Sequence, residues 1–142
     1  MALWHHRIMS LIAVVVGLVV AAEAVLVLAG WRTAWLDGYS KAQVAWLAGM
    51  PAWAAWTLGA WGVLALVGAL CLAGRVAAAA WMTGFAFLAQ LVLTIWAFAF
   101  AAPPVQTTTE ATLWTFALAG LVLSAAVWLY ARGERRRDDG VL

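Results

Sequence analysis

The sequence predicts an all-α integral membrane protein: an antiparallel bundle of four transmembrane helices, with a short interfacial helix in the first outer loop. Three observations predict this fold class. Hydrophobic residues make up 68% of the 142 residues and charged residues only 10%, whereas a water-soluble domain carries about 45–50% apolar and about 25% charged residues. The apolar residues fall into four long runs, and the charged residues gather between the runs and at the chain ends.

The four apolar runs define the predicted spans. A transmembrane helix needs about 20 predominantly apolar residues, and the stretches that qualify are residues 8–30, 52–74, 76–102 and 113–131. The chain is therefore a single transmembrane domain over residues 1–142, with a charged cytoplasmic tail at 132–142. This composition excludes a water-soluble enzyme, a disordered chain and a nucleic-acid-binding protein. Cys71 is the only cysteine, which excludes a disulfide within the chain.

Lysine and arginine are distributed unequally between the two predicted membrane faces. The two ends of the chain and the connection at Arg75 hold six of the eight basic residues, and the opposite face holds only Arg32 and Lys41. Because cytoplasmic loops are enriched in Lys and Arg, both termini are predicted to face the cytoplasm of a bacterial inner membrane. The first apolar run also resembles a secretory signal peptide with a small-residue cleavage site at residues 22–24, and this alternative stays open.

The connections between the spans differ in length. Only one or two residues around Arg75 join the second and third spans, which predicts a tight antiparallel hairpin. In the long first connection, Ser40 and Gln43 have the spacing of a capping box, and Pro51 would stop a helix that followed. We therefore expect an interfacial helix over residues 41–49.

The tail at 132–142 contains four arginines. One interpretation is binding of anionic lipids, because basic residues near a membrane surface are attracted to them. The alternative is a topology anchor with a frayed end, and the sequence favours the anchor.

Most of the eleven tryptophans fall near the predicted membrane interfaces, where an amphipathic ring lies at headgroup depth. The predicted anchors at the outer interface are Trp31, Trp35, Trp53, Trp56, Trp96 and Trp114. Trp4 and Trp128 fall near the inner interface. Trp61 and Trp81 lie deeper and are predicted to face protein, because an indole N–H in hydrocarbon needs an acceptor.

Small residues recur at a spacing of four on three of the spans, which permits close approach of helices in lipid. The residues in this pattern are Gly17 and Ala21, then Ala65, Ala69 and Ala73, then Gly120 and Ser124. In an alanine-rich chain the pattern is a weak signal.

Glu23 is the one ionisable residue well inside a predicted span. It lies seven residues from the outer end of its helix, so about 10 Å deep at 1.5 Å per residue. A charge near the centre of a spanning helix costs about 2.5–3.5 kcal/mol to insert, so Glu23 is predicted to be either neutral or matched by partners. The candidate partners at the same depth are Thr57, Gln90, Thr94 and Thr115. Convergence of these five residues predicts either interhelical hydrogen bonds, which we favour, or a small polar pocket for a ligand.

The residues that membrane enzymes and metalloproteins use are missing from the spans. The only histidines are His5 and His6, and they lie outside the spans, so the sequence does not support haem ligation inside the bundle. No nucleophile–base pair, phosphate loop or metal-ligand spacing is present. We predict no catalytic site, no metal site and no cofactor.

The second span and its flanks resemble a family of small, uncharacterised four-span bacterial inner-membrane proteins that are loosely described as sugar transporters. The residues that carry the resemblance are Tyr39 to Gln43, Pro51-Ala52-Trp53, Trp56, Gly59, Trp61-Gly62, Gly68 and Arg75. They cover about a third of the chain. The resemblance implies the four-span topology, and it implies no mechanism.

The function predicted from these features is non-catalytic: a small accessory or scaffold subunit that packs against a larger inner-membrane complex. Its predicted partners are membrane lipids and either another membrane protein or a second copy of the chain, with no nucleic acid. The alternative is a carrier that binds a small molecule, a quinone or a lipid in a polar pocket around Glu23.

Overall fold

The computed structural model describes the backbone of residues 2–29, 45, 49–101 and 110–139, and the side chains of residues 4–29, 45, 49–101 and 117–136. Within these residues the secondary structure is helical, without a strand. The long elements are α1 (Ala2–Leu28), α3 (Ala52–Ala73), α4 (Ala79–Ile95), the π-helical segment η2 (Trp96–Ala101) that continues α4, and α5 (Glu110–Asp139).

Three stretches of helix are long and apolar enough to cross a membrane. They are Trp4–Leu28 of α1, Ala52–Ala73 of α3, and Ala79–Ala101, which combines α4 and η2. The prediction of an all-helical chain is confirmed, and the three stretches support the class of membrane protein.

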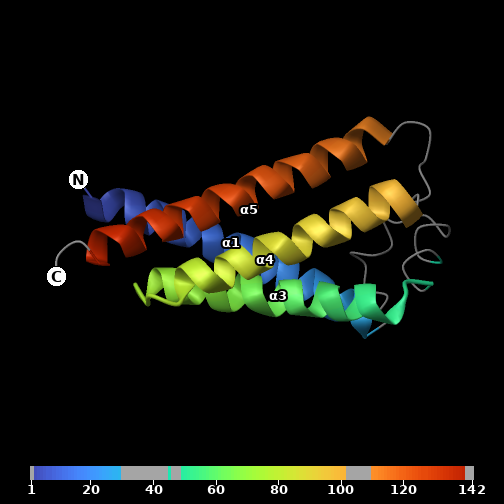
Figure 1. Ribbon diagram of the computed structural model, residues 1–142, viewed down its shortest axis with the longest axis horizontal. Coiled ribbons are helices and arrows are strands. Elements are labelled where there is room, and N and C mark those ends of the chain that lie inside the picture. The colour runs from blue at the N-terminus through green and yellow to red at the C-terminus, as the bar shows by residue number, and fades with distance from the viewer. Residues whose placement is uncertain (1, 30–44, 46–48, 102–109, 140–142) are drawn as a thin grey trace.

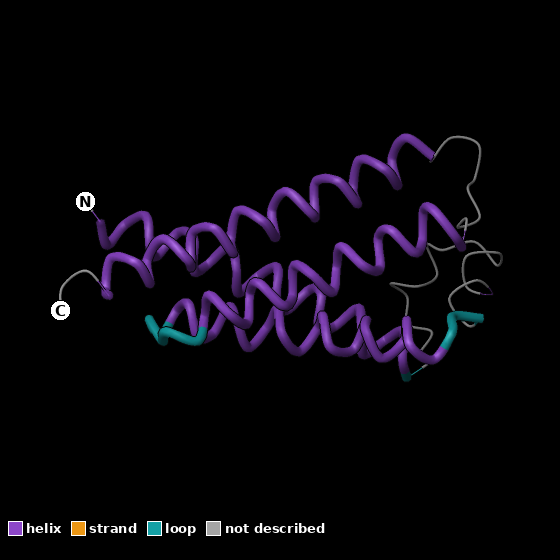
Figure 2. The backbone as a smooth tube through the Cα atoms, in the orientation of Figure 1, coloured by secondary structure: helices purple, strands orange, loops and turns teal. Residues whose placement is uncertain are grey.

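The helices form an antiparallel bundle in which neighbours along the chain are neighbours in space (Figure 1). α3 packs against α1 on one side and α4 on the other, and α5 packs against α4. The start of α1, the end of α5 and the connection between α3 and α4 all lie at the same end of the bundle, which we call the Arg75 end. The short α3–α4 connection is the teal turn at that end in Figure 2. Toward the opposite end, α5 diverges from α3 (Figure 1).

Small residues form the contact between α1 and α3. A Cβ atom added at Gly17 would lie 3.0 Å from the Ala65 carbonyl oxygen, and one added at Gly62 would lie 2.9 Å from the Ala24 Cβ. The Cα of Ala21 lies 3.3 Å from the same Gly62 position. The small-residue faces predicted on the first two spans therefore do meet, and they bring the two backbones together as such spacing allows.

The connection between α3 and α4 is a Schellman turn around Arg75. The Val76 amide donates to the Cys71 carbonyl at 2.8 Å, and the Arg75 amide donates to the Leu72 carbonyl at 3.1 Å. Arg75 has a φ of 56°, the left-handed conformation that glycine usually supplies at this position. The tight antiparallel hairpin is confirmed, but its connection is residues 74–78 rather than the one or two residues predicted. α4 begins at Ala79 rather than at 76, because these residues form the turn that closes α3.

The buried core lies toward the Arg75 end, where all four helices contribute to it. Its residues are small or of moderate size: Ala13, Ala69, Leu72, Ala79, Ala80, Val127 and Ala131. Because most of these side chains are alanines, the helices approach closely at this end.

Two predicted features at the ends of the helices have different outcomes. α5 continues beyond the apolar run through the charged tail as far as Asp139, because arginine and glutamate are good helix formers. Of the interfacial helix predicted over residues 41–49, the structure describes Ala45, which is helical, and Gly49, whose amide donates to the Ala45 carbonyl at 2.9 Å. The rest of that helix lies outside the described residues.

Candidate functional site

Two of the three threonines that were predicted to join a polar cluster with Glu23 bond back to their own helices. The Thr57 hydroxyl donates to the Trp53 carbonyl at 2.8 Å, and the Thr94 hydroxyl donates to the Gln90 carbonyl, also at 2.8 Å. Such i to i−4 bonds satisfy a hydroxyl within one helix. Neither hydroxyl needs a partner from another helix.

Gln90 and Glu23 contact different helices. Gln90 is 7% exposed on α4, and its Nε2 lies 2.9 Å from the position of a Cβ at Gly120, so the amide packs against α5. Glu23 is half-buried on α1, one residue before Ala24, which contacts α3. Within the described side chains no hydrogen bond joins Glu23 to Thr57, Gln90 or Thr94. The Thr115 side chain lies outside that part of the chain, and the cluster as a ligand site stays a prediction.

The tryptophans near the opposite end of the bundle are partly described. Trp53 and Trp56, in the first turns of α3, are 48% and 79% exposed. The Trp53 ring meets the Trp96 ring edge to face, with 5.6 Å between centroids. Their roles as interface anchors stay predictions, as do those of Trp31, Trp35 and Trp114, whose side chains the structure does not describe.

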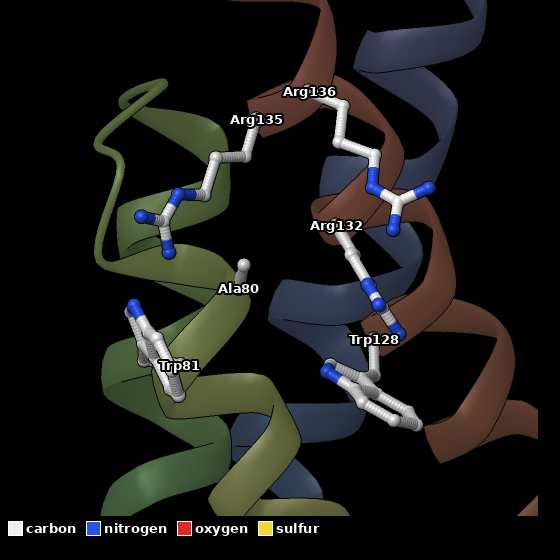
Figure 3. Close-up of a pocket in the computed structure, with 6 residues that line it drawn as sticks. All are labelled: Ala80, Trp81, Trp128, Arg132, Arg135 and Arg136. Atoms are coloured by element: carbon white, nitrogen blue, oxygen red, sulfur yellow. The ribbon is translucent and has the colours of Figure 1, made fainter. Parts of the chain in front are cut away.

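A pocket lies at the Arg75 end, between α4 and α5 (Figure 3). It has a volume of about 450 Å³ and is lined by Ala80, Trp81, Trp128, Arg132, Arg135 and Arg136. We call it the Trp–Arg pocket. Its volume falls within the range of about 300–1,000 Å³ that is typical of small-molecule sites.

Two columns of stacked side chains frame the Trp–Arg pocket. On one side the Arg135 guanidinium lies 5.5 Å from the centre of the Trp81 ring, and Trp81 stacks on Phe85 with 6.3 Å between ring centroids. The pocket therefore has a charged head and an aromatic wall that continues along α4 toward the middle of the bundle.

The second column has the same order of groups. The Arg132 guanidinium lies 6.0 Å from the centre of the Trp128 ring, and Trp128 stacks on Phe87 with 5.7 Å between centroids and 12° between planes. Figure 3 shows the two tryptophans facing each other across the pocket with the arginines above them. Each cation–π contact orients a guanidinium while leaving its charge in place.

Among the described side chains, the charged groups of the Trp–Arg pocket all have one sign. Three arginines line it, and no described carboxylate does. A guanidinium presents several N–H donors in a planar fork that matches the oxygens of a phosphate group. Chemically, the pocket combines a site for an anionic, phosphate-like group with an apolar aromatic wall beneath it.

Sequence reasoning identified the parts of this pocket but not the pocket. It placed Trp128 near an interface and treated the tail arginines as an anchor, and it expected Trp81 to face protein. In the structure Trp81 is 57% exposed, and its partner is the guanidinium of Arg135 rather than a buried acceptor. The i to i+4 spacing of Trp128 and Arg132 was the available signal.

Comparison with family models, with curated protein sequences and with solved structures found no match. The resemblance to a small four-span family therefore stays a prediction.

Proposed function

We propose that this protein is a non-catalytic accessory or scaffold subunit of a bacterial inner membrane, and that it binds the phosphate headgroup of an anionic lipid in the Trp–Arg pocket. The observation that carries the lipid proposal is the pair of columns, Arg135–Trp81 and Arg132–Trp128, on either side of one pocket. Basic pockets between transmembrane helices on the cytoplasmic side are known lipid headgroup sites.

The proposal includes a fourth membrane crossing by α5 and a cytoplasmic Arg75 end. Residues 113–131 form 19 consecutive residues without an Asp, Glu, Lys or Arg, close to the length that a crossing needs. α5 also runs antiparallel to α4, so it returns to the side on which α1 begins (Figure 1). The six basic residues at that end favour its location in the cytoplasm.

Topology can be measured with reporter fusions in a bacterial inner membrane. We expect a fluorescent protein fused after residue 142 to fluoresce and alkaline phosphatase fused there to be inactive, because the first folds in the cytoplasm and the second outside it. Phosphatase inserted after residue 105 should be active. An active phosphatase at the C-terminus would contradict the four-span topology.

The lipid fits the pocket through both of its parts. The phosphate would meet the three guanidiniums at the membrane surface, and an acyl chain would lie along Trp81 and Phe85, which are 57% and 50% exposed on α4. Each basic residue near the surface contributes about 1 kcal/mol to the attraction of anionic lipids. The site therefore favours an anionic over a zwitterionic lipid by charge, and an amphiphile over a free anion by its aromatic wall.

The double variant Arg132→Gln/Arg135→Gln tests the lipid site. We expect it to weaken the binding of phosphatidylglycerol roughly 30-fold, because two contributions of about 1 kcal/mol are lost and 1.4 kcal/mol corresponds to a factor of ten. Binding is measured by native mass spectrometry of the full-length protein, released from phosphatidylcholine nanodiscs with increasing phosphatidylglycerol.

The matched control is Arg7→Gln. Arg7 is exposed at the same end of the bundle and lines neither the Trp–Arg pocket nor the smaller cavity beside it. Its loss should change the affinity for phosphatidylglycerol by less than about twofold, because Arg7 lies outside the pocket and salt screens a surface charge from a lipid it does not contact. If the double variant and the control lost the same affinity per arginine removed, the binding would come from general attraction to a basic surface, and the proposed site would be overturned.

A further inference from the structure

A second, smaller cavity adjoins the Trp–Arg pocket. It has a volume of about 60 Å³ and lies among α1, the α3–α4 turn and α5, where His6, Arg75, Ala79, Glu134 and Arg135 are among the residues that line it. We call it the His6 cavity. Arg135 lines both cavities, and Ala79 and Ala80, one in each lining, are consecutive in α4.

His6, one of the residues that line this cavity, has a buried ring nitrogen without a hydrogen-bond partner among the described residues. His6 is only 6% exposed, and its Nδ1 makes no hydrogen bond within the described part of the chain. Its Nε2 lies 3.4 Å from the Ser10 hydroxyl, beyond the usual range of about 2.7–3.2 Å for a hydrogen bond. A buried imidazole nitrogen without a partner is costly, so a group held in this cavity would satisfy it.

Arg75 reaches the His6 cavity from a strained position. Its φ of 56° is the left-handed conformation that glycine adopts without cost and that an arginine does not. Strained residues of this kind are concentrated at functional sites. Arg75 is one of the residues that line the His6 cavity, and glycine at this position would carry no guanidinium.

The charges of the two cavities together favour a ligand with more than one negative group. Four arginines line them: Arg75, Arg132, Arg135 and Arg136. Among the described side chains of the two linings, the carboxylate is that of Glu134, in the His6 cavity. One water molecule needs about 10–15 Å³ of such volume, so the His6 cavity has room for about four waters, or for one phosphate group of five heavy atoms.

We propose that the lipid bound by this protein carries two phosphate groups, one in the Trp–Arg pocket and one in the His6 cavity, with Arg135 between them. This inference rests on the proposed function, because the first phosphate is the headgroup already assigned to the Trp–Arg pocket. The second phosphate accepts hydrogen bonds from Arg75 and from His6 Nδ1. Two sources have this chemistry: a cardiolipin, with two phosphodiesters joined by a glycerol, and a polyprenyl diphosphate.

The test compares lipids with one and two phosphates at equal phosphate concentration. The full-length protein in phosphatidylcholine nanodiscs is titrated with phosphatidylglycerol and with cardiolipin, and separately with a polyprenyl monophosphate and its diphosphate, and binding is read by native mass spectrometry. We expect at least one two-phosphate lipid to bind about tenfold or more tightly than its one-phosphate counterpart, because it adds charge-assisted hydrogen bonds to Arg75. The pair that shows the preference identifies the source.

Arg75→Gly separates binding from folding. It removes the guanidinium and places glycine in the left-handed turn, so we expect the unfolding midpoint to rise by a few degrees. The ratio of the affinity for the two-phosphate lipid to the affinity for the one-phosphate lipid should fall to about one, while phosphatidylglycerol still binds. His6→Phe, which keeps a ring beside Tyr130 but removes the nitrogens, should reduce the preference in the same direction. Arg7→Gln, at the same end but outside both cavities, should leave it unchanged.

The outcomes distinguish the two proposals. Equal binding of one-phosphate and two-phosphate lipids to the unaltered protein, or a preference that survives Arg75→Gly, would overturn the two-phosphate inference and leave the lipid site intact. If Arg132→Gln/Arg135→Gln alters no lipid affinity, both proposals fail. Inorganic pyrophosphate that binds as tightly as the lipids would show a soluble ligand and contradict both.

Discussion

Replacement of Trp128 by alanine is expected to destabilise the bundle by about 3 kcal/mol, the lower part of the range for large aromatic residues, because Trp128 is half-buried. Its indole fills the space opposite Gly84, where an added Cβ would lie 2.8 Å from Nε1. It also stacks on Phe87 at 5.7 Å and lies under the guanidinium of Arg132 at 6.0 Å. Alanine would leave a cavity between α4 and α5 and remove these contacts together.

The free energy of unfolding of Trp128→Ala can be measured by titration of the protein in mixed micelles with a denaturing detergent. Trp56→Ala is the matched control, because Trp56 is 79% exposed and its removal creates no cavity between helices. We expect the control to cost less than about 1 kcal/mol. If the two variants had the same free energy of unfolding, that result would contradict the packing of Trp128 between α4 and α5.

The second large effect is expected at Gly17. A Cβ there would lie 3.0 Å from the Ala65 carbonyl oxygen and 3.0 Å from the Leu66 Cα. Both are backbone atoms, so no side chain can rotate away and α1 must separate from α3. We expect Gly17→Ala to cost about 1–3 kcal/mol, the usual result of overpacking, and Gly17→Leu to cost more because the whole helix contact is lost.

Gly133→Ala is the control for that prediction, because in the described part of the chain nothing outside the local backbone of α5 lies within 4 Å of a Cβ added at Gly133. Replacing a glycine within a helix should stabilise it by about 0.5–1 kcal/mol. The two glycine-to-alanine changes are thus expected to have opposite signs in the same unfolding assay. A stabilising effect of Gly17→Ala would show that α1 and α3 are farther apart than the structure has them.

The feature that sequence predicts best in this chain is where helices exist. A run of about 20 apolar residues without charge has one stable arrangement in lipid, because every backbone N–H and C=O must be paired within the segment. The ends of helices are predicted less well. The start of α4 at Ala79 depends on the Schellman turn at Arg75, and the π-helical segment from Trp96 to Ala101 has no signal that we recognised in the sequence.

The candidate site was harder to predict, for a reason specific to membrane proteins. Depth along a helix follows from residue number, and so Glu23 and Gln90 were expected at one level. Rotation about the helix axis does not follow, because lipid and protein interior are similarly apolar and no amphipathic pattern marks the inward face. Gln90 in fact packs toward α5 at Gly120, and Glu23 lies on α1 beside the α3 contact.

The amino-acid order alone determined that the chain is helical and apolar, that one turn is tight, and that basic residues gather at one end, since these properties depend on local composition and on backbone pairing in lipid. Only the tertiary structure decided which arginine lies over which tryptophan. Trp81 and Arg135 are 54 positions apart in the chain and meet because α4 and α5 pack antiparallel at a rotation that side-chain fit selects. The packing of Gly84 against Trp128 contributes to that rotation, and no local pattern specifies it.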